Sequence, residues 1–196
     1  MLLVAEVTRV RRKYHSALHF IPHALGVGGL FAELKRRAID YVVLRWFDEL
    51  PQLQPGEDLD LLISDEAYET VMELLVSEPG IQPCDLYTPS GRPRTDYLAA
   101  SYDPPSLARP ILAGAVTHRG LCQTPGPKDY FHSLAYHAVY HKGAKSGLPG
   151  SEAYRRKQRP AKHNFAAILG QQARQLGIDA TMTLEGLHAY LQSQGW

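Results

Sequence analysis

The sequence contains few cysteines, no long apolar run and almost no net charge, and each shortage excludes a class of protein. Cys84 and Cys122 are the only cysteines among 196 residues, which is too few for a disulfide framework and favours a reducing compartment. No apolar run approaches the ~20 residues that a transmembrane helix needs. The formal net charge of +1 gives no overall attraction to nucleic acid or to a membrane surface.

The N-terminal residues also lack the order of a secretory signal. A short apolar stretch at residues 1–4 precedes a basic cluster within residues 9–13, whereas a signal peptide begins with its basic part. We therefore expect a cytoplasmic protein, with the basic cluster on a solvated helix face. The apolar fraction of 44% and the charged fraction of 21% are typical of a globular chain of one domain, or of one domain with a helical appendage.

The spacing of apolar residues predicts alternating helices and strands in the first part of the chain. Helical spacing predicts helices at residues 1–21, 30–39 and 66–77. Runs rich in β-branched and aromatic residues, or short apolar runs, predict strands at residues 41–45, 58–63 and 81–87. Residues 88–127 are dense in Pro and Gly, with one further strand or an irregular segment at 111–121. Such alternation indicates an α+β or α/β sheet with flanking helices.

The last third of the chain has a helical pattern. Helices are expected at residues 128–142, 160–176 and 183–194, after a boundary marked by Pro125-Gly126-Pro127. We therefore predict an α/β domain over residues 1–124, of which 1–29 form an N-terminal helical extension. Residues 125–196 form a helical C-terminal part.

Two aspartates lie two positions apart in the predicted strand 58–63. Successive side chains of a strand point to opposite faces, so Asp58 and Asp60 share one face while Leu59 and Leu61 point to the other, towards covering helices. Two carboxylates this close repel each other unless a positive charge or water compensates them. A divalent cation and a solvated strand end are the two explanations.

A third aspartate, Asp85, lies between apolar residues on the next predicted strand. Magnesium prefers oxygen ligands and usually binds one or two carboxylates together with substrate phosphates. Three carboxylates can hold two metal ions, which clamp the attacking and leaving oxygens of a phosphoryl transfer. The candidate catalytic and metal-binding residues are Asp58, Asp60 and Asp85, with Mg²⁺ or Mn²⁺ as the cofactor.

In this context the sequence resembles bacterial nucleotidyltransferase-like proteins of the polymerase-beta-type superfamily, some of which are associated with cell-surface polysaccharide biosynthesis. The resemblance covers residues from about 30 to 145 and, more faintly, the C-terminal helices. It rests on Tyr41-Val42-Val43-Leu44-Arg45, Leu50-Pro51, the run from Gly56 to Ile63, and the run from Phe131 to Gly143. It implies a nucleotidyltransferase-like mixed sheet, in which Asp58 and Asp60 hold magnesium and Asp85 activates the attacking hydroxyl. The implied reaction moves a nucleotidyl or phosphoryl group from a nucleoside triphosphate to a hydroxyl acceptor.

The chain departs from the family pattern directly after the first strand of the sheet. The superfamily usually has a Gly-Ser or Gly-Gly pair there, whereas this chain has Arg45-Trp46-Phe47, and a Trp does not permit the same close backbone approach to a triphosphate. Arg45 can substitute by holding phosphate through its planar guanidinium. Equally, the change fits a binding or scaffolding module without catalysis. A third alternative is a toxin–antitoxin nucleotidyltransferase that acts on RNA or protein.

Two further patterns in the helical part have a functional and a structural interpretation. His137 and His141 lie one helical turn apart, as zinc ligands can, but no third ligand is evident, and we favour histidines packed at an interface. His141 or Lys142 in contact with a substrate phosphate is the intermediate interpretation. The basic stretch 142–162 predicts a solvated loop rather than a polyanion-binding arm, and since Tyr154 is its only aromatic residue, nucleic-acid binding is disfavoured.

Overall fold

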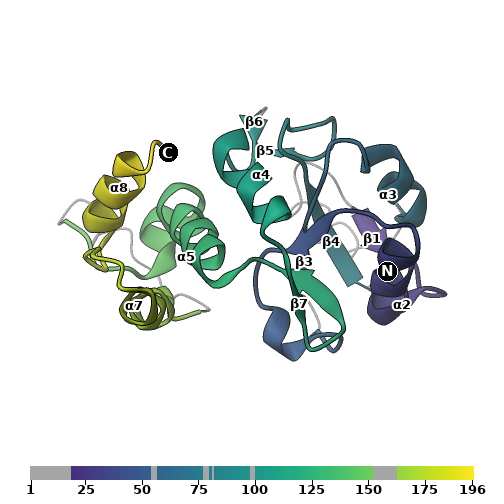
Figure 1. Cartoon of the computed structure of the whole chain (residues 1–196), viewed down its shortest axis with the longest axis horizontal. Helices are drawn as coiled ribbons and strands as arrows, with labels where there is room; N and C mark the ends of the chain where they lie inside the picture. The colour runs from purple at the N-terminus through teal and green to yellow at the C-terminus, as the bar shows by residue number, and fades with distance from the viewer. Residues whose placement is uncertain (1–18, 54–56, 77–79, 81, 98–99, 152–162) are drawn as a thin grey trace, which may run out of the picture. The chain divides into compact units, whose positions relative to one another are not determined.

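Figure 1 shows a computed structural model of the chain, which describes residues 19–53, 57–76, 80, 82–97, 100–151 and 163–196. The chain divides into two compact units between Thr124 and Pro125, the position at which the composition changes, and each unit is described by itself. Most of the predicted helix at 1–21 lies outside the described residues. Its last three residues, His19–Ile21, form a strand, β1, so the helix prediction is wrong there.

A four-stranded mixed sheet forms the centre of the first unit. Its strand order is β1-β4-β3-β2, in which β3 and β4 are parallel while β1 and β2 run antiparallel to their neighbours. The chain thus has an α+β fold, as the alternation predicted. The strands that follow β1 are β2 (Tyr41–Val43), β3 (Leu59–Ile63) and β4 (Gln82–Tyr87).

One face of this sheet carries the hydrophobic core of the unit. Leu59 and Leu61 pack in a cluster with Phe31 of helix α2 (Gly26–Arg36) and Val71 of helix α3 (Tyr68–Leu74). The alternation predicted for β3 is therefore correct, since its odd-numbered residues face the helices. Helix α2 begins earlier than the helix predicted at residues 30–39. Helix α3 is shorter than the helix predicted at residues 66–77.

The opposite face of the sheet contacts helix α4 (Pro105–Ala113), which the sequence analysis missed. Pro105 suits the first turn of a helix, where no N–H is needed. Pro110, however, lies inside this nine-residue helix, and a proline at such a position normally indicates a break. The region 111–121 was predicted to hold a strand or an irregular segment. It holds the strand β7 (Val116–His118), which pairs with β8 (Cys122–Thr124), and its first residues are the end of α4, which was not predicted.

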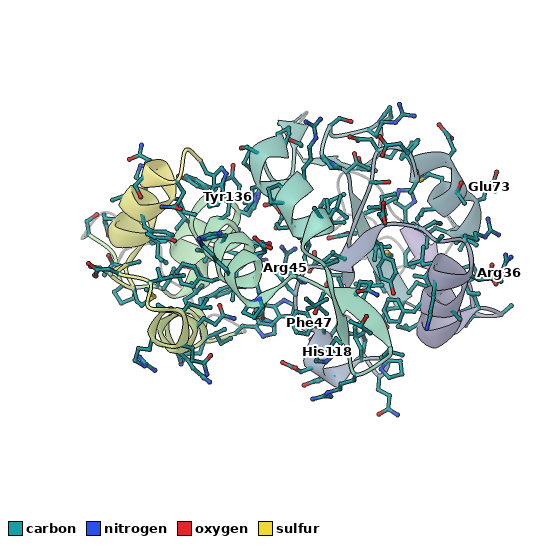
Figure 2. The ribbon with its side chains drawn as sticks, in the orientation of Figure 1. Arg36, Arg45, Phe47, Glu73, His118 and Tyr136 are labelled. Atoms are coloured by element: carbon teal, nitrogen blue, oxygen red, sulfur yellow. The ribbon has the colours of Figure 1, made fainter. Side chains whose placement is uncertain are left out.

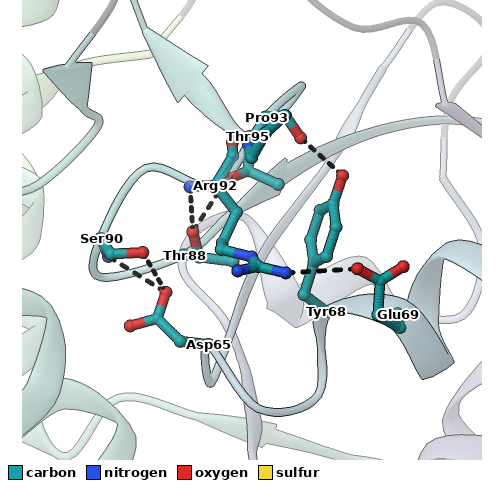
Figure 3. Close-up of polar contacts among 8 residues, drawn as sticks. All are labelled: Asp65, Tyr68, Glu69, Thr88, Ser90, Arg92, Pro93 and Thr95. Atoms are coloured by element: carbon teal, nitrogen blue, oxygen red, sulfur yellow. Dashed lines mark hydrogen bonds and ion pairs between the residues drawn. The ribbon is translucent and has the colours of Figure 1, made fainter.

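The loop at residues 88–95, which follows β4, is fixed to the start of α3 by polar contacts (Figure 3). The backbone N and the hydroxyl of Ser90 donate to Asp65 Oδ1 at 3.2 and 2.6 Å. The hydroxyl of Tyr68 donates to the carbonyl of Pro93 at 2.8 Å, and the Arg92 guanidinium lies 4.8 Å from the centre of the Tyr68 ring. This loop leads into a small antiparallel pair, β5 (Asp96–Tyr97) and β6 (Ala100–Ser101), directly before α4.

The second unit is helical, as predicted. The elements described in it are α5 (Pro127–Tyr136), the π-helix η2 (His137–Lys142), the 3₁₀-helix η3 (Gly143–Ser146), α7 (Phe165–Leu176) and α8 (Leu184–Ser193). The side chain of Asn164 accepts from Ala167 N at 3.1 Å, and that of Thr183 accepts from Gly186 N at 3.0 Å, so both last helices have capped N-termini. The expected single helix at 128–142 changes its winding at His137. Of the helices that the structure describes, none has the length and apolar character required to cross a membrane.

We predict that Gly91→Ala destabilises the first unit more than Gly120→Ala does. Both glycines have positive φ, +66° and +71°, so either alanine costs roughly 1–2 kcal/mol of backbone strain. Only at Gly91 would the new Cβ also meet backbone, at 2.9 Å from Ser101 N, while nothing lies within 4 Å at Gly120. The additional loss for Gly91→Ala is about 1–3 kcal/mol, measurable by urea unfolding. Equal losses in the two variants would contradict the close approach.

Candidate functional site

The three predicted aspartates come together on the face of the sheet that is turned away from α2 and α3. Asp60 in β3 is the register partner of Asp85 in the parallel strand β4, so their side chains share a face. Asp58 comes two residues before Asp60 and shares its alternation. Burial raises the pKa of Asp85 to about 7, with further contributions from the charges of Asp60 and Asp58. We call Asp58, Asp60 and Asp85 the acidic cluster.

The positive charge beside the acidic cluster comes from the chain itself. Arg45 follows β2 and is 3% exposed; its Nε donates to Asp60 Oδ2 at 3.1 Å and its Nη2 donates to Oδ1. Pairing of Leu44 N with the Asp60 carbonyl at 3.0 Å brings Arg45 to this position. Burial by itself would lower the pKa of Arg45, but the Asp60 charge raises it well above its ordinary value. The guanidinium therefore stays charged and takes the role of counter-ion for Asp60.

Two tyrosines complete the surroundings of this ion pair, and the sequence analysis did not identify either. The Tyr87 hydroxyl lies within donating distance of Asp60 Oδ1, at 3.2 Å, and of Asp85 Oδ2, at 3.4 Å. The rings of Tyr87 and Tyr102 are stacked with centroids 4.1 Å apart, and the Arg45 guanidinium lies 5.2 Å from the centre of the Tyr102 ring. Burial raises the pKa of both tyrosines well above the ordinary value, so both hydroxyls keep the proton at neutral pH.

A fourth aspartate, Asp103, is buried directly before α4. It is 3% exposed, and among the described residues neither of its carboxylate oxygens meets a hydrogen-bond partner. Burial raises the pKa of Asp103 to about 7, although the Arg45 charge works in the opposite direction. In the sequence, Asp103-Pro104-Pro105 has the pattern of a solvated turn before a helix, so no local signal marked it as buried.

The turn after Arg45 is left-handed. Trp46 has φ +56° and ψ +33° at the start of the 3₁₀-helix η1 (Phe47–Glu49), a conformation that glycine adopts without cost and a bulky residue rarely adopts. Phe47 then packs edge-on against His118 of β7, with ring centroids 5.1 Å apart (Figure 2). The turn therefore lies where the resemblance places a glycine pair, but with a large side chain in it.

The remaining predicted phosphate contacts belong to the second unit. His141 and Lys142 end the π-helix η2, a winding that is frequent at functional sites. The His141 ring lies among other rings, 5.9 Å from that of His137 and 5.6 Å from that of Tyr136, while Lys142 is exposed. This packing fits the interpretation of interfacial histidines. Phosphate binding by His141 or Lys142 stays a prediction.

The donor set of the acidic cluster has the chemistry that Mg²⁺ or Mn²⁺ prefers, because it consists of carboxylate oxygens. In the arrangement described, Asp60 already accepts from Arg45 and Tyr87. Within the described parts of the chain, no group of three or more His, Cys, Asp or Glu side chains is placed so that it could hold a metal ion. A divalent cation therefore fits these ligands by type, and full use of Asp60 requires that Arg45 release it.

Comparison with known proteins gave no match with a family model, a curated protein or a solved structure.

We predict that Arg45→Met destabilises the protein by about 3–5 kcal/mol, because it leaves Asp60 as a buried charge without its partner. The matched control is Arg36→Met. Arg36 pairs with Glu33 at 2.7 Å on an exposed surface of α2, where such a pair contributes about 0–1 kcal/mol. In a double-mutant cycle measured by urea unfolding, Asp60→Asn should recover part of the Arg45→Met loss. Equal losses for Arg45→Met and Arg36→Met would contradict the role of Arg45.

The raised pKa of Asp103 predicts that its presence costs stability as the pH rises from about 4 to about 7. An unfolded aspartate releases its proton near pH 3.9, whereas folded Asp103 retains it up to about pH 7. Between these values the folded state binds more protons, so the free energy of unfolding falls by at most about 1.4 kcal/mol per pH unit for this group. Urea unfolding from pH 4 to 8 should therefore show a shallower decline in Asp103→Asn, and parallel curves would disprove the prediction.

Proposed function

We propose that the chain is a metal-dependent nucleotidyltransferase-type enzyme. In this proposal the first unit is a nucleotidyltransferase-like sheet domain, and it moves a nucleotidyl or related phosphoryl group from a nucleoside triphosphate to a hydroxyl acceptor. The observation that supports it is the convergence of Asp58, Asp60 and Asp85, two of them register partners in adjacent parallel strands. Phosphoryl transfer needs little more from a protein than such positioning of charge.

Each carboxylate has a role in the proposed reaction. Asp58 and Asp60 hold Mg²⁺ or Mn²⁺, which when bound supplies the charge that neutralises the reacting phosphoryl oxygens. Asp85 either completes the ligand set or accepts the proton of the acceptor hydroxyl. The burial that raises the pKa of Asp85 in the metal-free chain favours the second role, because a stronger base accepts a proton more readily. Tyr87 orients the Asp60 and Asp85 carboxylates through its hydroxyl.

The second candidate function is a binding or scaffolding module that has the same fold and no catalysis. Two observations favour it: Arg45 already neutralises Asp60, and Trp46 occupies the turn where a triphosphate would need close backbone contact. Calorimetric titration with Mg²⁺ and a panel of nucleoside triphosphates separates the two functions. Heat of binding that requires the metal supports the enzyme, and no heat with any nucleotide supports the module.

We expect Asp58→Asn and Asp85→Asn to weaken metal-dependent nucleotide binding at least about 100-fold, because even groups that only orient metal ligands contribute about 10–100-fold to affinity. Both substitutions keep the side-chain shape, so the circular dichroism spectrum should not change. Asp40→Asn is the control, since Asp40 is an exposed aspartate of the same unit. If calorimetry finds the same nucleotide affinity in both site variants as in the unaltered chain, the acidic cluster does not take part in nucleotide binding.

A further inference from the structure

Arg45 and Asp103 each retain hydrogen-bonding capacity that the described structure leaves unused. Arg45 donates to Asp60 through Nε and Nη2, while its Nη1 is buried and meets no partner among the residues described. Asp103 is buried too, with both oxygens equally unmatched in that part of the chain. Buried polar groups are nearly always paired, because leaving one unpaired costs its full desolvation. A free donor and a free acceptor in one buried network therefore indicate a second arrangement in which they meet.

The two groups belong to the same network. Tyr102 joins them, because its ring lies 5.2 Å below the Arg45 guanidinium and Asp103 is the next residue in the chain. The Arg45 charge lowers the pKa of the Asp103 carboxyl against the larger effect of burial, as an opposite charge in the same buried region does. A rotation of the long Arg45 side chain across the Tyr102 ring would keep the cation–π contact and exchange one carboxylate for the other.

From this geometry we propose that Asp103 is a positioning residue for the acidic cluster: it receives the Arg45 guanidinium when a divalent cation takes Asp60. The inference rests on the proposed function, since it supposes that the acidic cluster binds metal. Arginine does not lose its charge in proteins, so a cation that displaced it without a second carboxylate would leave a buried, uncompensated guanidinium. Asp103 removes this penalty and thereby makes Asp60 available to the metal.

The test is a calorimetric titration of the full chain with Mn²⁺, without nucleotide. We expect Asp103→Asn, which has the same shape but no charge, to weaken Mn²⁺ binding about tenfold, within the usual range for coupled neighbours. Asp40→Asn, the exposed control, should bind as the unaltered protein does. Thermal melts with and without Mn²⁺ give a second readout, because a ligand of the folded state raises the melting temperature, and a tighter ligand raises it more at the same concentration.

A double-mutant cycle with Arg45→Met separates positioning from general structural damage. Without the guanidinium there is nothing for Asp103 to receive, so Asp103→Asn should cause no further loss of Mn²⁺ affinity in that background. Arg45→Gln serves if Arg45→Met does not fold. An Asp103→Asn loss that persists without Arg45 would overturn the proposal, because it would show a merely structural role.

The outcomes also separate this inference from the proposed function. If the unaltered chain binds Mn²⁺ and Asp103→Asn binds it equally well, the second position for Arg45 is disproved while the metal site stands. If the unaltered chain binds no Mn²⁺ at all, both fail. A titration with Mg²⁺ in place of Mn²⁺ can be followed in ¹⁵N spectra by the Arg45 Nε–H signal, which is identified by its loss in Arg45→Met. This signal should shift on addition of Mg²⁺ in the unaltered chain and shift much less in Asp103→Asn.

Discussion

The buried ion pair between Arg45 and Asp60 is the interaction on which the rest of the acidic cluster depends. It places a permanent positive charge beside Asp60 of β3, which would otherwise repel its register partner Asp85 of β4. Tyr87 binds to the same carboxylate, Tyr102 lies under the guanidinium, and Asp85 is held with a raised pKa beside them. A network of this kind is sensitive throughout, because each buried member relies on the others for its charge balance.

The ion pair is compatible with both functional interpretations of the chain. A resting enzyme needs its metal ligands compensated before the metal arrives, and a non-catalytic module needs the same compensation permanently. Arg45 meets both needs in the same geometry, so the difference between the two functions lies in whether the guanidinium can leave. In the arrangement proposed above, Asp103, which is buried and without a partner among the described residues, receives the guanidinium.

The sequence could predict the features that depend on the spacing of residues close together in the chain. The alternation of Leu59, Asp60 and Leu61 determined which side chains face the helices, and the Asp-bearing strand at 82–87 is indeed the neighbour of β3. Strand β1 could not be predicted, because its three residues gain their conformation from pairing with β4, more than 60 positions away. Arg45 was singled out as a phosphate ligand, and its contact with Asp60 depends on the pairing of β2 with β3. Asp103 and Tyr102 come from a distant loop, and α4 was hidden by Pro110.

The parallel register of β3 and β4 has a consequence for how the acidic cluster can change during evolution. Asp60 and Asp85 are partners in a strand pair whose other face is apolar apart from Gln82 at the start of β4. A one-residue deletion in either strand would turn its aspartate into the core beneath α2 and α3 and would bring apolar residues to the face that holds Arg45. Such an error would unfold the unit rather than modify its chemistry. The carboxylates can therefore be altered only one substitution at a time, and the spacing between them is protected by the same hydrophobic packing that holds the sheet.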